Sequence, residues 1–356
     1  MKKIMIIALL GIVTLLAPSR AMAAAEQWKY GQGISITLKN GENVNFSSES
    51  IEQVIYVGES IGFKVYLIND RVVDFLYSQI STVTYIGQGE EPPIPDNNLN
   101  KNTLLNKCPE AWRLEFPHMH ETGNQSYVTK RTNDFGITYS AEWDNDLIAN
   151  RWSVYEMYAG NLLDNCSRKD DFKEDPELPA ATRSTLADYS SSGFSRGHLC
   201  PSADRLCSTE QNKQTFFLSN MQPQYQFHNG GQWAVLEGKV RTWAEQCDTL
   251  YVVKAATIGD VTINGVTQTG LRPELCNNRL IVPKYFYMAL MKYNKSTDTY
   301  SAVGIWTYHS KNSSEKIEQY ITIDELEART GIDFFCNLPD DVETEVEQTY
   351  NANDWK

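Results

Sequence analysis

Positive charge is scarce in this sequence. Its 356 residues include 32 lysines and arginines against 45 aspartates and glutamates, which gives a net charge of −13. This balance argues against a protein whose whole surface attracts nucleic acid or an acidic membrane. If the substrate is nevertheless a polyanion, the few cations must be gathered at one cleft near His198, with Arg196, Arg205 and Lys284 as candidates.

Closely spaced cysteines are also missing. The sequence has seven cysteines, and no two of them form a C-x-x-C pair, so a structural zinc ribbon is not expected. An odd number leaves at least one thiol unpaired or joined to another chain. The spacing does not define a connectivity. The cysteines are Cys108, Cys166, Cys200, Cys207, Cys247, Cys276 and Cys336.

Long apolar runs are absent beyond the N-terminus. Lys2 and Lys3 precede an apolar run that ends at Ala17, and Ala21-Met22-Ala23 offers a small-residue cleavage site, which is typical of a signal peptide over residues 1–23. The run is short for a membrane span, and no later segment is apolar enough to form one. We therefore expect a secreted or periplasmic protein, with a mature net charge of about −16.

The remaining chain divides into three parts by composition. Residues 24–86 predict a small β-rich domain without catalytic character, because apolar and polar residues alternate at 34–38, 44–46, 63–67 and 73–77. Residues 87–101 are rich in proline, glycine and acidic residues and predict a linker. Residues 102–356 mix strand and helix patterns and predict an α+β domain.

Within the third part, the hydrophobic periodicity predicts six strands and a long helix. Trp233, Leu236, Val240, Trp243 and Cys247 recur three or four residues apart, which indicates a helix over 230–247. Thr322 is a candidate N-cap for a second, short helix. The expected strands cover 126–131, 135–142, 152–158, 215–218, 250–256 and 281–291, with a polar connection over 164–192.

One stretch carries the strongest chemical signal. In Arg196-Gly197-His198, a histidine stands beside an arginine and a glycine. A neutral imidazole can activate water near neutral pH, and a guanidinium can bind phosphate through paired hydrogen bonds. Gly197 would let a bulky polymer approach. The alternative reading is a surface turn with a solvated histidine.

A second stretch supplies oxygen ligands. Asn220, Asn229 and Glu237 follow the histidine, and hard cations such as Mg²⁺ accept amide and carboxylate oxygens while keeping several waters. Glu237 lies beside the apolar stripe of the expected helix rather than on its solvated face. Two alternatives remain open here: Asn229 as a helix N-cap, and Glu237 in an ordinary ion pair on a helix surface.

These residues together resemble the DNA/RNA non-specific endonuclease family, which has a ββα-metal core. The family motif Asp-Arg-Gly-His is matched by Ser195-Arg196-Gly197-His198, and an Asn-x-x-Pro-Gln strand end is matched at Asn220 to Gln224. Asn229 and Glu237 match the asparagine and glutamate of the following helix. The resemblance covers about residues 110–350, with further similar segments at 175–179, 188–189, 282–286 and 330–335.

The resemblance implies a role for each residue. His198 would be the general base, Arg196 a phosphate contact, Asn229 the direct ligand of Mg²⁺ or Mn²⁺, Glu237 the holder of a metal-bound water, and Asn220 a support. Ser195 departs from the family aspartate and cannot supply its charge. Arg131 and Arg151 are candidates for a second family arginine.

The expected function is a metal-dependent endonuclease that acts on DNA, RNA or both with little sequence preference. Two other classes remain as alternatives. One is a catalytically silent nucleic-acid-binding homologue, which Ser195 and the acidic charge favour. The other is a cell-surface adhesion protein whose function resides in residues 24–86.

Overall fold

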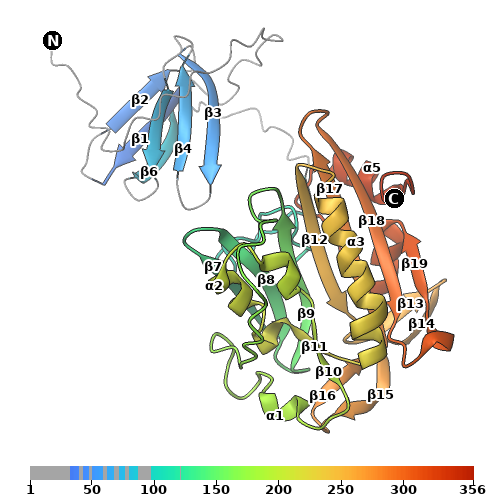
Figure 1. Ribbon diagram of the computed structural model, residues 1–356. Helices are drawn as coiled ribbons and strands as arrows, with labels where there is room; N and C mark the ends of the chain where they lie inside the picture. The colour runs from blue at the N-terminus through green and yellow to red at the C-terminus, as the bar shows by residue number, and fades with distance from the viewer. Residues whose placement is uncertain are drawn as a thin grey trace, which may run out of the picture. The chain divides into compact units, whose positions relative to one another are not determined.

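The computed structural model describes residues 33–39, 43–47, 50–58, 62–67, 72–76, 80–86, 98–120 and 122–356. The chain forms two compact units, residues 1–93 and 94–356 (Figure 1). The expected signal peptide and residues 87–97 of the expected linker lie outside the described residues. In the parts that are described, no helix is both long and apolar enough to span a membrane.

The first unit contains two three-stranded antiparallel sheets, ordered β2-β1-β6 and β3-β4-β5. Ile34 and Ile36 of one sheet share a buried apolar cluster with Val65 and Val73 of the other. The alternating pattern predicted β1, β2, β4 and β5 but not β3 or β6. The strands are β1 (Gly33–Leu38), β2 (Asn43–Ser47), β3 (Ile51–Gly58), β4 (Gly62–Leu67), β5 (Val72–Leu76) and β6 (Ile80–Ile86).

A seven-stranded antiparallel sheet organises the second unit, in the order β19-β18-β17-β12-β9-β8-β7. Five of these strands lie where the sequence predicted them; β18 and β19 were not foreseen. The strands are β7 (Gln125–Thr132), β8 (Gly136–Asp144), β9 (Ala149–Met157), β12 (Thr249–Ala256), β17 (Tyr285–Asn294), β18 (Thr299–Tyr308) and β19 (Glu318–Ile321).

Both faces of this sheet are covered, and β12 and β17 near its centre are accordingly apolar at most positions. On β17, Phe286 and Met288 belong to one buried cluster with α3 (Ala234–Ala244), whereas Tyr287 and Ala289 belong to another with α4 (Ile323–Thr330) and α5 (Asp340–Gln348). Helix α3 therefore covers one face, and α4 and α5 cover the opposite face. Figure 1 shows α3 running along the sheet.

The remaining elements are short. Two-stranded sheets are formed by β10 with β11, β13 with β14, and β15 with β16. As expected, Thr322 caps α4, its hydroxyl accepting a hydrogen bond from the Glu325 backbone N–H. These elements are α1 (Leu186–Tyr189), α2 (Thr209–Gln214), β10 (Ser195–His198), β11 (Met221–Gln224), β13 (Asp260–Ile263), β14 (Val266–Thr269), β15 (Leu271–Cys276) and β16 (Leu280–Pro283).

Two strand predictions need correction. Residues 215–218 are not a strand: the Thr215 N–H bonds back to Gln211 and Asn212, so the segment ends α2 instead. Its apolar side chains are buried in irregular structure, and periodicity alone does not distinguish this from a buried strand. The strand expected over 281–291 is two strands, β16 and β17, with Lys284 between them.

All seven cysteines are free thiols in this structure. Cys200 is completely buried in the apolar cluster under α3, where it packs as a small hydrophobic side chain.

Candidate active site

Two strands and a helix assemble the site from a contiguous part of the sequence. Strands β10 and β11 pair antiparallel, with His198 opposite Met221. The helical turn that follows leads into α3, and the indole N–H of Trp233 donates to the backbone oxygen of His198 at 3.2 Å. This hydrogen bond fixes the helix against the strand that carries the histidine.

A cleft of about 760 Å³ opens beside this unit. Ser195, Arg196 and Asn229 line it, together with Arg168 and Phe172 from the polar connection that precedes β10. The connection therefore forms part of the cleft wall opposite the strand pair.

His198 lies under the cleft surface, with only 7% of its area exposed. Its ring packs near Phe172 and edge-on against Phe216, with ring centroids 5.7 and 5.0 Å away. Nε2 is buried and has no hydrogen-bond partner among the described residues. Burial, together with the positive charges of Arg168, Arg196 and Lys254, lowers the pKa of His198 to about 3. The imidazole is therefore neutral and able to accept a proton.

Two arginines flank the histidine, each stacked on an aromatic ring. The guanidinium carbon of Arg196 lies 3.9 Å from the ring centre of Phe172, and that of Arg168 lies 4.9 Å from the centre of Phe216. Arg168 also pairs with the exposed Asp170 at 2.6 Å. In the described part of the chain, no carboxylate is within ion-pair distance of Arg196. The arrangement leaves cationic donors available to a phosphate group.

The structure brings neither candidate for a second arginine to the cleft. Arg131 pairs with Glu110, and Arg151 pairs with Glu142 and Asp144, so carboxylates neutralise both candidates. Neither lines the cleft. Arg168 does, and the sequence signal nearest to it is the aromatic Phe172, four residues later in a largely polar connection.

Two other cations expected near the histidine serve the framework. Arg205 is completely buried and donates to the backbone oxygens of Thr138 and Glu156. Lys284 donates to Gln268 and does not line the cleft. Instead, Lys254 of β12 is the third cation whose charge acts on His198.

Asn229 faces the cleft from within a helix. Its backbone N–H donates to Tyr225 O at 2.9 Å, so Asn229 is not the helix N-cap, and that alternative is wrong. The turn His228–Trp233 is a π-helix, a wider turn that is frequent at functional sites. The glycines at 230 and 231 tolerate this distortion.

Glu237 is half-buried on the first turn of α3. Burial, helped by the Asp204 charge and opposed by the charges of Lys254 and Arg241, raises the pKa of its carboxyl group to about 7. Asp204 itself accepts from Tyr155 at 2.7 Å and pairs with Arg241 at 2.9 Å. Glu237 forms no ion pair within 4 Å among the described residues, so the reading as an ordinary surface ion pair is not supported.

Asn220 is a buried brace rather than a cleft residue. Its amide nitrogen donates to Cys200 O and Thr215 O, and its amide oxygen accepts from Cys200 N and from the Ser153 hydroxyl. These bonds hold the chain immediately after His198. Ser195 reaches the cleft, and its hydroxyl donates to Gln226 Oε1 at 2.6 Å.

Position 197 needs a glycine because a larger residue would clash with a neighbouring side chain, rather than because a polymer must approach it. A Cβ atom at this position would lie 2.3 Å from Oε1 of Gln224. Gln224 is completely buried, and neither of its amide atoms has a partner among the described residues. The glycine therefore makes room for a buried amide beside the histidine strand.

A strand pair, a helix and a buried neutral histidine beside stacked arginines define a nuclease of the ββα-metal class. The family model described as DNA/RNA non-specific endonuclease matches residues 118–341, and the chain belongs to this family. Members are metal-dependent hydrolases of phosphodiester bonds. A solved structure of an EndoG/EndoGI complex has a TM-score of 0.51 over 59% of this chain and 86% of that one, at 22% identity, and confirms the expected ββα-metal nuclease fold.

Several characterised proteins are similar in sequence. A nuclease of Nostoc sp. is 30% identical over 59% of this chain and 75% of its own length. Mitochondrial nuclease EXOG of Mus musculus is 27% identical over 59% of this chain and 57% of its own. Nuclease C1 of Cunninghamella echinulata is 39% identical over 36% of this chain and 56% of its own length. The chain thus spans little more than half the length of the last two.

Proposed function

We propose that this chain is an exported, divalent-metal-dependent endonuclease that cleaves DNA, RNA or both, with His198 as general base. The observation that carries this proposal is the buried, unpartnered Nε2 of His198 between two stacked arginines at a cleft. A neutral imidazole accepts a proton from water as the water attacks phosphorus. Arg196 and Arg168 bind and orient the phosphoryl oxygens and stabilise their developing charge.

The donor set suits a hard divalent ion such as Mg²⁺, or Mn²⁺. Asn229 offers a neutral oxygen at the cleft, and Glu237 lies farther along the same helix, as a residue that holds a metal-bound water would. Such an ion keeps most of its waters and needs few protein ligands. When bound, it would supply Lewis-acid stabilisation and an acidic water for the leaving oxygen. The ionised carboxylate of Glu237 is the stronger acceptor for a metal-bound water, so its pKa matters to its role.

The cleft favours contacts with the nucleic-acid backbone. Guanidinium groups on aromatic rings bind phosphates, which carry no sequence information. We therefore expect cleavage with little sequence preference. Export rests on the N-terminal pattern of Lys2, Lys3 and Ala21-Met22-Ala23, and the destination is the periplasm or the medium.

The deciding experiment is cleavage of supercoiled plasmid and of single-stranded RNA by the full chain, with Mg²⁺ and with a chelator. His198→Ala should lower the rate at least about a hundredfold, the usual scale for a general base, with an unchanged circular dichroism spectrum. His118→Ala is the matched control, since this partly exposed histidine lies outside the strand–strand–helix unit, where its backbone N–H donates to Asp333 O. A His198→Ala rate close to that of the control would remove the histidine from the mechanism.

The two alternative functions give different results. A catalytically silent homologue would bind the nucleic acid without cutting it at any Mg²⁺ concentration. An adhesion protein would owe its function to the first unit, so a chain lacking residues 24–93 would lose function. The nuclease proposal expects that shortened chain to retain its cleavage rate.

A further inference from the structure

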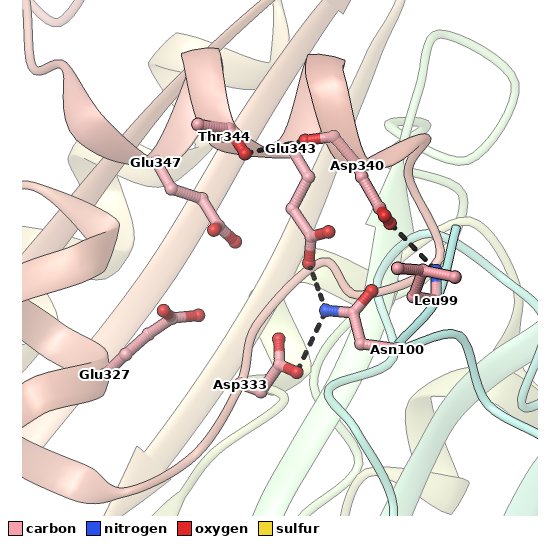
Figure 2. Close-up of a pocket in the computed structure, with 8 residues that line it drawn as sticks. All are labelled: Leu99, Asn100, Glu327, Asp333, Asp340, Glu343, Thr344 and Glu347. Carbon is pink, nitrogen blue, oxygen red and sulfur yellow. Dashed lines mark hydrogen bonds between the residues drawn. The ribbon is translucent and has the colours of Figure 1, made fainter. Parts of the chain in front are cut away.

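A second pocket lies among elements that cover the sheet face opposite α3. It has a volume of about 390 Å³ and shares no lining residue with the cleft. Helix α5, the end of α4 and the segment after residue 98 enclose it, and its lining is predominantly acidic (Figure 2). Asn100, Glu327, Asp333, Glu343 and Glu347 supply most of the polar atoms.

The carboxylates are close enough to share one ligand. One oxygen each of Asp333, Glu343 and Glu347 lies within 4.8 Å of the others, and the same holds for Asp324, Glu327 and Glu347. Glu347 belongs to both groups and is therefore central to the cluster. In Figure 2 its carboxylate points toward that of Glu327, with Glu343 and Asp333 beside them.

Buried acceptor atoms in this pocket lack donors. Glu347 is only 7% exposed, and its Oε1 has no hydrogen-bond partner in the described parts of the chain. Oδ1 of Asn100 is likewise buried and unpartnered, while its Nδ2 donates to Asp333 at 3.1 Å and to Glu343 at 2.9 Å. A buried carboxylate without a donor or counter-charge is costly.

Counter-charges from the protein do not compensate this cost. Among the described residues, no lysine or arginine forms an ion pair with Glu327, Asp333, Glu343 or Glu347. Burial, and then repulsion among the carboxylates, raises the pKa of Glu347 to about 10 and that of Glu327 to about 8. For Glu343, burial raises the pKa to about 7. Near neutral pH the cluster must bind either protons or a cation.

We propose that this pocket binds a calcium ion, with Glu347 at its centre and Glu343, Asp333 and Glu327 as the other acidic ligands. Calcium takes six to eight oxygen ligands in an irregular arrangement, whereas Mg²⁺ demands a near-ideal octahedron. The carboxylate and amide oxygens of this pocket come from three separate segments, and such an irregular set of ligands suits calcium. This site is independent of the catalytic metal site and would tie Asn100 to α5.

The test is calcium binding by the full chain at pH 7.5, measured by isothermal titration and by the thermal unfolding midpoint. Asn229→Ala serves as the background, so that the cleft does not contribute a metal site. We expect binding and a rise of the midpoint by about 5 °C at calcium concentrations a hundredfold above the dissociation constant. Magnesium should bind at least tenfold more weakly. Glu347→Gln, introduced into the Asn229→Ala background, should abolish the calcium-dependent rise of the midpoint.

Glu345→Gln is the matched control, because Glu345 is exposed on the same helix. It should leave calcium binding unchanged. If Glu347→Gln does not fold, Glu343→Gln makes the same test, since it also removes one ligand. No heat and no change of the midpoint with calcium would overturn the proposal and show that protons neutralise the cluster. An equal loss of binding in Glu345→Gln would overturn it too, by placing the ion elsewhere.

Discussion

The pH dependence of cleavage should be governed by Glu237 rather than by His198. The pKa of His198 is lowered to about 3, so its ionisation does not affect the rate above about pH 5. The pKa of Glu237 is raised to about 7, so about a tenth of it is ionised at pH 6 and about nine-tenths at pH 8. We therefore expect kcat/KM to rise about tenfold between pH 6 and pH 8.

The assay is kcat/KM for plasmid cleavage at constant ionic strength and low Mg²⁺, across pH 5–9. Glu237→Gln should lower the value at pH 8 by about ten- to a hundredfold, as expected for a residue that holds a metal-bound water, and should remove the rise. Glu237→Asp, the control that keeps an ionisable group, should retain a rise. More Mg²⁺ should move the wild-type rise to lower pH, because the cation competes with the proton.

Stability should change with pH in the opposite direction. A folded-state pKa above the unfolded value means that the folded protein binds the proton more tightly. The stabilising contribution of Glu237 is present below its unfolded pKa of 4.5 and is lost as pH rises toward about 7, by at most about 3 kcal/mol. Glu237→Gln should flatten this part of the dependence of unfolding free energy on pH.

The activity measurement can refute the reasoning. If Glu237→Gln still shows a tenfold rise in kcat/KM between pH 6 and pH 8, the rise belongs to another group and this reasoning is refuted.

Three further predictions concern the same site. Gly197→Ala should lower the free energy of unfolding by about 1–3 kcal/mol in urea denaturation, because Gln224 must move. Gly259→Ala is the control and should lower it less, because the space around a Cβ atom there is open. An equal loss of stability in the two variants would contradict this. Ser195→Asp should maintain or increase the cleavage rate, because a nearby carboxylate raises the pKa of the imidazole and makes it a stronger base, and should leave the pH-dependent rise near pH 7 to Glu237; a large loss would show that the site depends on the hydroxyl. Substrate affinity should fall steeply with salt, and Arg168→Ala should reduce the slope of log affinity against log salt by about one; an unchanged slope would exclude Arg168 as a phosphate contact.

The parts of the site that lie close together in the sequence were predictable. His198, Asn220, Asn229 and Glu237 all lie within residues 198–237, on or beside the two strands and the helix of one unit, so a short stretch of sequence contains the motif that resembles the family. The long helix and most sheet strands were likewise predictable, because their periodicity reflects burial on one or two faces.

The parts brought together by tertiary folding were not predictable. Arg168 comes from an irregular connection with no periodicity, and Lys254 comes from a central strand whose apolar neighbours suggest only core packing. Asn100 meets Glu343 from 243 positions away. In each case the signal lies in a contact between distant segments, which composition and spacing do not contain.

The position of the arginines also bears on how a base with so low a pKa can work. Part of the depression of the His198 pKa comes from the charges of Arg168 and Arg196, the groups proposed to bind phosphate. A bound phosphate partly neutralises both charges and places a negative charge near the ring, and each effect raises the pKa of the imidazole. His198 then becomes a stronger base only when substrate is present. Without substrate the ring remains neutral, so the cleft avoids the cost of a buried imidazolium beside the two arginines.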